Sequence, residues 1–135
     1  MLGRLVWIAL FAGTLWAGYH WTFVASRANP GASPRGAMNA FADALLTDNV
    51  PAMRLLCRAE ATRQIDELRA ELATRRQRGS PVIQISVTGN TGGTNGRAQG
   101  LLMVTDRTGN TLPLWDIYAT QDPAGRWWID RFTPR

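Results

Sequence analysis

The chain has 135 residues and a formal net charge of +5, with 15 Lys and Arg side chains against 10 Asp and Glu. This length leaves room for one domain of about 100 residues beside a short targeting segment, but not for two cores. The basic balance suits an anionic membrane surface, whereas nucleic acid is not an expected partner because no basic patch with interleaved aromatic residues is evident. The single cysteine, Cys57, excludes an intramolecular disulfide and a thiolate metal cluster. Its apolar neighbours predict a buried thiol.

The N-terminal segment is apolar over residues 5–24, which contain no Asp, Glu, Lys or Arg. Twenty helical residues span about 30 Å, the thickness of the hydrocarbon core of a bilayer. Trp16, Tyr19 and Trp21 gather at one end, where amphipathic rings favour the membrane interface. We therefore predict a transmembrane signal-anchor over residues 1–25, with the lipid bilayer as its partner.

A cleaved signal peptide is the alternative, since residues 24–26 would make an acceptable cleavage site. The apolar run is longer than the 7–15 residues that are usual for such a peptide. Orientation is weakly specified, because Arg4 lies on one side of the run and Arg27 and Arg35 lie on the other. The short N-terminal tail favours a soluble domain on the extracytoplasmic side.

Helical patterns follow a linker over residues 26–35, which is rich in Gly, Pro, Ser and Ala. Ser33 and Pro34 are typical of an N-cap and a first helical position, and they open the folded domain expected over residues 36–135. Apolar periodicity predicts a helix to about Asp48, a short helix opened by Pro51, and a longer helix over about 59–78.

The apolar period changes after Pro81, where Ile83, Ile85 and Val87 alternate with polar residues as in a half-buried strand. Further apolar segments predict strands over about 98–106, 111–120 and 126–132. Turns this short require antiparallel pairing. The expected fold class is α+β, with an N-terminal transmembrane helix followed by helices packed on one face of a curved antiparallel sheet of about four strands.

This order of elements resembles the nuclear-transport-factor-2-like (cystatin-like) superfamily over about residues 36–134. The step Asp48-Asn49-Val50-Pro51-Ala52 is similar to the end of its first helix, and Trp127, Ile129 and Phe132 are similar to its last strand. The membrane-anchored branches are the most similar: small bacterial envelope proteins, accessory proteins of lipid-import systems, and scaffold subunits of conjugation machines. The resemblance implies a single-pass inner-membrane protein of the cell envelope with a non-enzymatic binding or assembly role.

The predicted middle strands are apolar on both faces, although helices can cover only one face. The second face would then meet a protein partner or a second copy of the chain. The expected interaction surface consists of Leu101, Met103, Trp115, Ile117 and Trp128, with the roles of the two faces open to exchange. Strong sheet curvature, with long arginine side chains covering the apolar surface, is the purely structural alternative.

Two other functions compete with this interpretation. A small apolar molecule such as a lipid could lie between the sheet and the long helix, although bulky Ile, Leu and Trp side chains predict that this space is filled. An enzyme of this fold could use Asp116, on the same strand face as Tyr118, as a general base. We expect no catalytic residues, no cofactor and no metal, because the soluble domain lacks histidine and shows no paired-carboxylate motif.

Two further motifs have structural explanations. The glycine-rich stretch 89–96 lacks the lysine and following helix of a phosphate-binding loop, so a hairpin loop is expected. The basic run over residues 75–78 would complement the dipole at a helix C-terminus. A contact with lipid phosphates or an acidic partner is the alternative for these arginines.

Overall fold

The computed structural model describes residues 29–89 and 92–135, and residues 31–135 form the compact folded unit. The predicted anchor over residues 5–24 lies outside the described residues. Within the described ranges, no helix is both long enough and apolar enough to cross a membrane.

Four helical segments precede the sheet in the described chain. They are η1 Pro30–Ala32, α2 Pro34–Leu46, α3 Val50–Leu56 and α4 Ala59–Gln77. The last three match the predicted helices to within two residues at most ends, whereas the short η1 lies in the segment predicted to be a linker. Ser33 caps α2, since its hydroxyl accepts a hydrogen bond from the Gly36 N–H at 3.0 Å, and Pro34 follows it. Asn49 caps α3 in the same way, accepting from the Ala52 N–H at 3.2 Å. Local capping chemistry therefore sets where these two helices begin.

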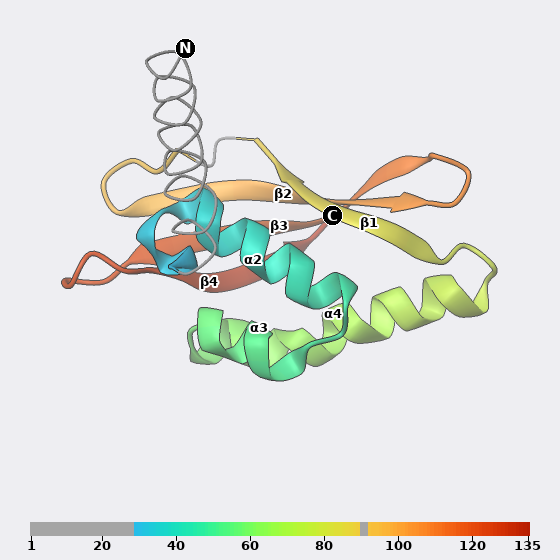
Figure 1. The fold of residues 1–135 in the computed structure, drawn as a ribbon, viewed down its shortest axis with the longest axis horizontal. Coiled ribbons are helices and arrows are strands. Elements are labelled where there is room, and N and C mark those ends of the chain that lie inside the picture. The colour runs from blue at the N-terminus through green and yellow to red at the C-terminus, as the bar shows by residue number, and fades with distance from the viewer. Residues whose placement is uncertain (1–28, 90–91) are drawn as a thin grey trace, which may run out of the picture. The chain divides into compact units, whose positions relative to one another are not determined.

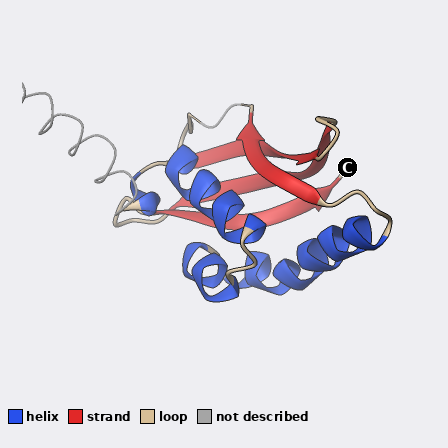
Figure 2. Ribbon diagram, turned by 45° about the vertical axis from the view of Figure 1, so that its right-hand side comes forward, coloured by secondary structure: helices blue, strands red, loops and turns tan. Residues whose placement is uncertain are grey.

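The strands form one antiparallel sheet in the order β1-β2-β3-β4, as the short turns require (Figure 1). They are β1 Val82–Thr88, β2 Arg97–Asp106, β3 Thr111–Gln121 and β4 Trp127–Pro134. Figure 2 shows α2, α3 and α4 gathered on one side of this sheet. The predicted α+β class, with helices packed against a four-stranded antiparallel sheet, is confirmed.

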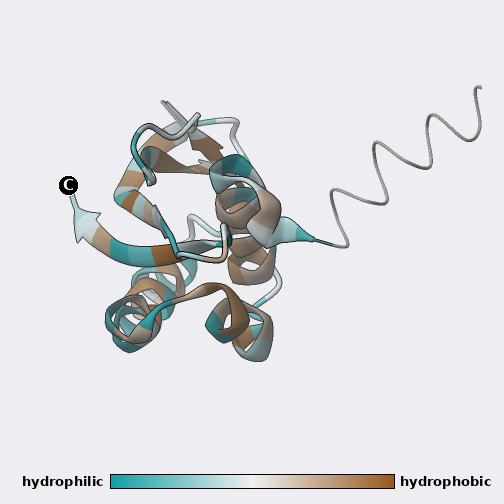
Figure 3. Ribbon diagram, turned by 90° about the vertical axis from the view of Figure 1, so that its left-hand side faces the viewer, coloured by the Kyte–Doolittle hydropathy of each residue, from teal (hydrophilic) through white to brown (hydrophobic). Residues whose placement is uncertain are grey.

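The face of the sheet toward the helices, called the inner face here, carries the core. Its fully buried members include Leu102, Ile117 and Ile129, and they meet Met38 and Phe41 of α2. Figure 3 shows hydrophobic stretches along both the strands and the helices. Burying side chains of this size contributes roughly 1.5–3 kcal/mol each, so this layer is the main source of stability.

Helix α2 approaches the sheet closely at Gly100 of β2. A Cβ atom there would lie 2.8 Å from Val87 Cγ1 and 3.0 Å from Met38 Sδ. Only glycine leaves enough room for both neighbours. The ring centroids of Phe41 and Phe132 lie 4.8 Å apart, so α2 also packs against β4.

A β-bulge between β2 and β3 places two consecutive side chains in the core. The register shifts after the pair Leu102–Trp115, because Met103 pairs with Pro113 and leaves Leu114 without a partner. Leu114 and Trp115 are consequently both buried, which strict alternation does not allow.

Another irregularity makes the alternation predicted for β1 wrong at Ile83. The sequence places Ile83 on the same face as Ile85, but the register shifts between Val82 and Gln84. Ile85 is buried, whereas Ile83 is 53% exposed.

A third irregularity corrects the faces predicted for the last strand. The sequence predicts that Phe132 shares a face with Trp128. The shift in register between Tyr118 and Ala119 instead leaves Phe132 buried on the inner face with Ile129, while Trp128 lies on the opposite face. Twist and bulging, which hydropathy does not encode, cause the difference.

Candidate functional site

The face of the sheet away from the helices, called the outer face, carries an apolar cluster across three strands. It comprises Leu101 and Met103 of β2, Tyr118 of β3 and Trp128 of β4, and we call these four residues the outer patch. All four are half-buried. Leu101 and Met103 alternate with core residues on β2, so they project to the same face.

Trp115 and Ile117 do not belong to this surface, which corrects the prediction from the sequence. Trp115 is 8% exposed and Ile117 is 0% exposed, and both lie on the inner face. The register explains this placement, because Trp115 pairs with the buried Leu102, whereas Leu101 pairs with Asp116. Of the five predicted surface residues, the outer face keeps Leu101, Met103 and Trp128.

Arginines cover the aromatic part of the outer patch, as the structural alternative predicted. The Arg126 guanidinium lies 4.2 Å from the Trp128 ring centroid, and that of Arg131 lies 4.4 Å from the Tyr118 centroid. The Trp128 indole N–H also donates to Asp122 Oδ2 at 2.8 Å, and this hydrogen bond is the main reason that the Asp122 pKa is lowered. The aromatic rings are thus fixed in place.

The aliphatic part of the outer patch differs from the aromatic part. Among the described residues, the two arginine stacks lie over the rings of Tyr118 and Trp128, whereas Leu101 and Met103 are aliphatic members at neighbouring positions on β2. These two side chains stand in a sheet whose helices all lie on the other side (Figure 2). They therefore form the apolar centre, and Arg126 and Arg131 form part of a charged rim, which is the usual anatomy of an interface.

Asp116, the candidate general base, lies on the outer face of the sheet and not among the core residues of the inner face. Its neighbours Trp115 and Ile117 point to the inner face, so Asp116 points outward, where Arg135 Nε lies 3.4 Å from its Oδ2. Within the described ranges, no three His, Cys, Asp or Glu side chains are grouped closely enough to hold a metal ion. Asp116 is thus an ion-paired residue of the outer face.

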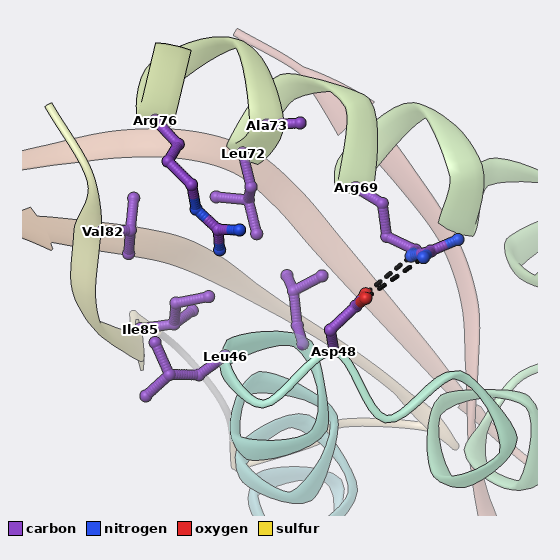
Figure 4. Close-up of a pocket in the computed structure, with 9 residues that line it drawn as sticks. Leu46, Asp48, Arg69, Leu72, Ala73, Arg76, Val82 and Ile85 are labelled. Atoms are coloured by element: carbon purple, nitrogen blue, oxygen red, sulfur yellow. Dashed lines mark hydrogen bonds and ion pairs between the residues drawn. The ribbon is translucent and has the colours of Figure 1, made fainter. Parts of the chain in front are cut away.

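A separate pocket of about 150 Å³ opens where the C-terminal end of α2, the second half of α4 and the start of β1 meet (Figure 4). Its walls are mainly apolar: Leu45, Leu46, Leu72, Val82 and Ile85. The sequence analysis did not identify this pocket. The end of α2 is distant in sequence from α4 and β1, and only tertiary packing brings it against them.

The pocket is lined by two arginines and one aspartate, and only one of the arginines, Arg69, forms an ion pair with a described residue. Arg69 holds Asp48 through two hydrogen bonds, Nε to Oδ1 at 2.6 Å and Nη2 to Oδ2 at 3.1 Å, and this pairing lowers the Asp48 pKa. Arg76 makes no hydrogen bond or ion pair with a described residue, and Figure 4 shows its side chain extending from α4 into the pocket. Because Asp48 offsets Arg69, the pocket has a net positive charge.

The two edges of the sheet differ in their backbone pairing. At β4, the Arg58 N–H donates to the Ile129 carbonyl at 2.8 Å. The Gln64 carboxamide donates to the Phe132 carbonyl and accepts from the Phe132 N–H, both at 2.8 Å. These contacts occupy the β4 edge, which blunts its tendency to recruit another strand.

The Cys57 thiol is buried at the end of α3, as its apolar neighbours predict. Burial raises its pKa to about 12. Because burial disfavours the thiolate, the contribution of Cys57 to the free energy of unfolding is fully present below the ordinary pKa of a thiol. This contribution is lost as the pH rises through the raised pKa.

We expect Cys57 of the native chain to react with iodoacetamide at pH 8 roughly a thousandfold more slowly than in urea, because the thiolate fraction falls about tenfold per unit of pKa. The measurement is the rate of alkylation by mass spectrometry with and without urea. Similar rates in both conditions would mean that the thiol is accessible and ionised in the native protein.

No protein-family model matches the chain, and a comparison with curated proteins gives no match. Function must therefore be inferred from the outer patch, the pocket and the two sheet edges themselves.

Proposed function

We propose that the chain is a membrane-anchored, non-enzymatic interaction domain of the bacterial cell envelope. Residues 5–24 would hold it in the inner membrane as a single-pass anchor, with the folded domain on the extracytoplasmic side. Its outer patch would bind a protein partner or a second copy of the chain. The anchor is supported by the uncharged apolar run and its aromatic end.

One observation carries the interaction role: the outer face has apolar residues at its centre although no described helix covers it (Figure 2). A solvated face of an antiparallel sheet is normally polar. Leu101 and Met103 depart from that rule, and aromatic, Met and Arg residues are those enriched in interfaces. The outer face also carries aromatic residues, Tyr118 and Trp128, with the arginines that stack on them.

The nuclear-transport-factor-2-like relationship is part of this proposal. Three helices followed by a four-stranded antiparallel meander are compatible with it. So is the position of Asn49 as the N-cap of α3, within the step that carries the resemblance. Both features describe packing, so they support a fold relationship and not a reaction.

Binding of a small apolar ligand is the second candidate function, and the pocket beside α4 is the observation that favours it. Its volume of about 150 Å³ is below the 300–1,000 Å³ of sites for drug-sized ligands. Large side chains fill the inner face elsewhere in the described domain. A whole lipid molecule therefore has no room there, and interaction through the outer patch is the better-supported function.

The test is crosslinking of the full chain in intact membranes, with Met103→Glu as the informative variant. A carboxylate at the centre of the outer patch would be desolvated without a counter-ion in the complex. We expect crosslinked species to fall at least tenfold, whether the partner is a second copy or another protein. Mass spectrometry of the adducts distinguishes these two partners.

Gln99→Glu is the matched control, because it adds the same charge on the same face of the same strand at an exposed site. It should leave crosslinking unchanged, and thermal unfolding of both variants shows whether the fold is retained. Equal crosslinking in the Met103 variant and the parent chain, with both folded, would exclude the outer patch as the interface.

A further inference from the structure

The β1 edge of the sheet is open. Along the free edge of β1, on the side away from β2, no backbone hydrogen bond joins the strand to another part of the described chain. The β4 edge differs, because Arg58 and Gln64 occupy it. Strand β1 also has no charged residue and no proline, the usual means of protecting an edge. Ile83 on this strand is 53% exposed. Such an edge offers its N–H and C=O groups to an added strand.

The pocket lies at the N-terminal end of this open edge. Val82 and Ile85 of β1 line it, facing Leu45 and Leu46 of α2 and Leu72 of α4. An apolar cavity of about 150 Å³ accommodates a benzene-sized molecule, so this pocket has room for one Leu, Val or Phe side chain. A strand that pairs with β1 could place one side chain there.

Arg76 adds a charge to the same end of the strand. Its guanidinium reaches into the pocket and has no hydrogen bond or ion pair with a described residue. Its charge contributes to lowering the Asp48 pKa, but the hydrogen bonds of that carboxylate are with Arg69. A carboxylate is the complementary group, because a guanidinium fork matches its two oxygens. A ligand for this site should thus combine an extended backbone, one apolar side chain and an adjacent carboxylate.

We propose that the β1 edge and the adjacent pocket bind the C-terminal end of a partner protein as an added antiparallel strand. Antiparallel pairing brings the C-terminus of the added strand beside Val82, the first residue of β1. Its last side chain then enters the pocket, and its terminal carboxylate meets Arg76. This inference rests on the proposed interaction role but uses a surface separate from the outer patch.

The test uses fluorescein-labelled hexapeptide pools with the last residue fixed as Leu, Val, Phe or Asp, made with either a free carboxylate or a carboxamide. Binding to the full chain in detergent micelles is followed by fluorescence anisotropy. We expect at least one apolar free-acid pool to bind tenfold or more tightly than its carboxamide counterpart, because a hydrogen-bonded charge pair is lost in the latter. Pools ending in Asp should bind more weakly than the apolar free-acid pools, because the last side chain enters the part of the pocket lined by Leu45, Leu72 and Val82.

Two arginine variants test the carboxylate contact. Arg76→Gln should weaken binding of the free-acid pool about tenfold or more and leave binding of the carboxamide pool unchanged. Arg78→Gln, in the same basic run but outside the pocket lining, is the matched control and should have no effect. Met103→Glu should also have no effect, so failure of the outer patch and failure of this site are distinguishable.

Hydrogen exchange tests the added strand, since peptide binding should slow exchange of amides in β1 and not in β4. Protection confined to other strands would overturn the proposal, as would equal binding of free-acid and carboxamide pools or no binding by any pool at millimolar concentration. If hexanoate alone binds as tightly as the best peptide, the site takes small carboxylates and strand addition is excluded.

Discussion

Replacing Phe41 by alanine should lower the free energy of unfolding by about 3–5 kcal/mol. Phe41 is 0% exposed, and its ring centroid lies 4.8 Å from that of Phe132 across the interface between α2 and β4. The variant loses both the transfer free energy of the ring and the contacts around the cavity that remains. For a domain of this size the melting temperature should fall by more than about 10 °C. Urea and thermal denaturation followed by circular dichroism give both quantities.

Leu55→Ala is the control for this prediction, because Leu55 is 70% exposed on the neighbouring helix α3. Its free energy of unfolding should change by less than about 0.5 kcal/mol. Equal destabilisation by the two substitutions would contradict a core centred on the contact of α2 with the inner face.

Replacing Gln64 by alanine should lower the free energy of unfolding by about 2–3 kcal/mol, a large effect for one polar side chain. The Gln64 carboxamide makes paired 2.8 Å hydrogen bonds with the N–H and C=O of Phe132. Without it, two partly buried backbone groups lose their partners, and each unsatisfied group costs about 1–3 kcal/mol unless water reaches it. The measurement is urea denaturation at neutral pH.

Two further variants separate hydrogen bonding from packing at Gln64. Gln77→Ala, an exposed site at the end of the same helix, should be nearly neutral. Gln64→Glu keeps the size of the side chain but cannot donate to the Phe132 carbonyl once ionised, so it should also destabilise the domain. A stable Glu variant would mean that packing, and not the hydrogen-bonded pair, explains the alanine result.

Gln64→Ala should also open the β4 edge of the sheet. An unpaired edge strand is a template for association with another chain. The Gln64→Ala variant should therefore show more self-association than Gln77→Ala at equal concentration, as measured by light scattering. Unchanged scattering would indicate that the Arg58 contact with Ile129 is sufficient to close the β4 edge.

The order and type of the described elements follow from the sequence because the signals are local. Ser33, Pro34 and Asn49 supply capping chemistry within one turn of the groups they bond. Gly79 has a positive φ of 79° at the end of α4, a conformation that glycine adopts without strain. Alternation and short turns then indicate an antiparallel meander, which leaves one arrangement of four strands. The predicted anchor, outside the described residues, depends on the same kind of local hydropathy.

The tertiary structure alone decides which residues face outward. Trp115 and Leu101 are both apolar side chains, but the register between β2 and β3 leaves Trp115 in the core and Leu101 on the outer face. Bulges arise from twist and packing, and each one reverses the alternation that follows it. The stack of Arg131 over Tyr118 likewise joins two residues that only the pairing of β3 with β4 brings together.

The pocket and the contrast between the two edges depend on contacts that are distant in sequence. Asp48 and Arg76 are separated in sequence by α3 and most of α4, and Gln64 meets Phe132 across 68 residues. A sequence shows that these side chains are polar but not which backbone groups they satisfy. Hydropathy and capping act over a few residues. The hydrogen bonds that close the β4 edge and the charges that line the pocket instead come from segments that only folding brings together.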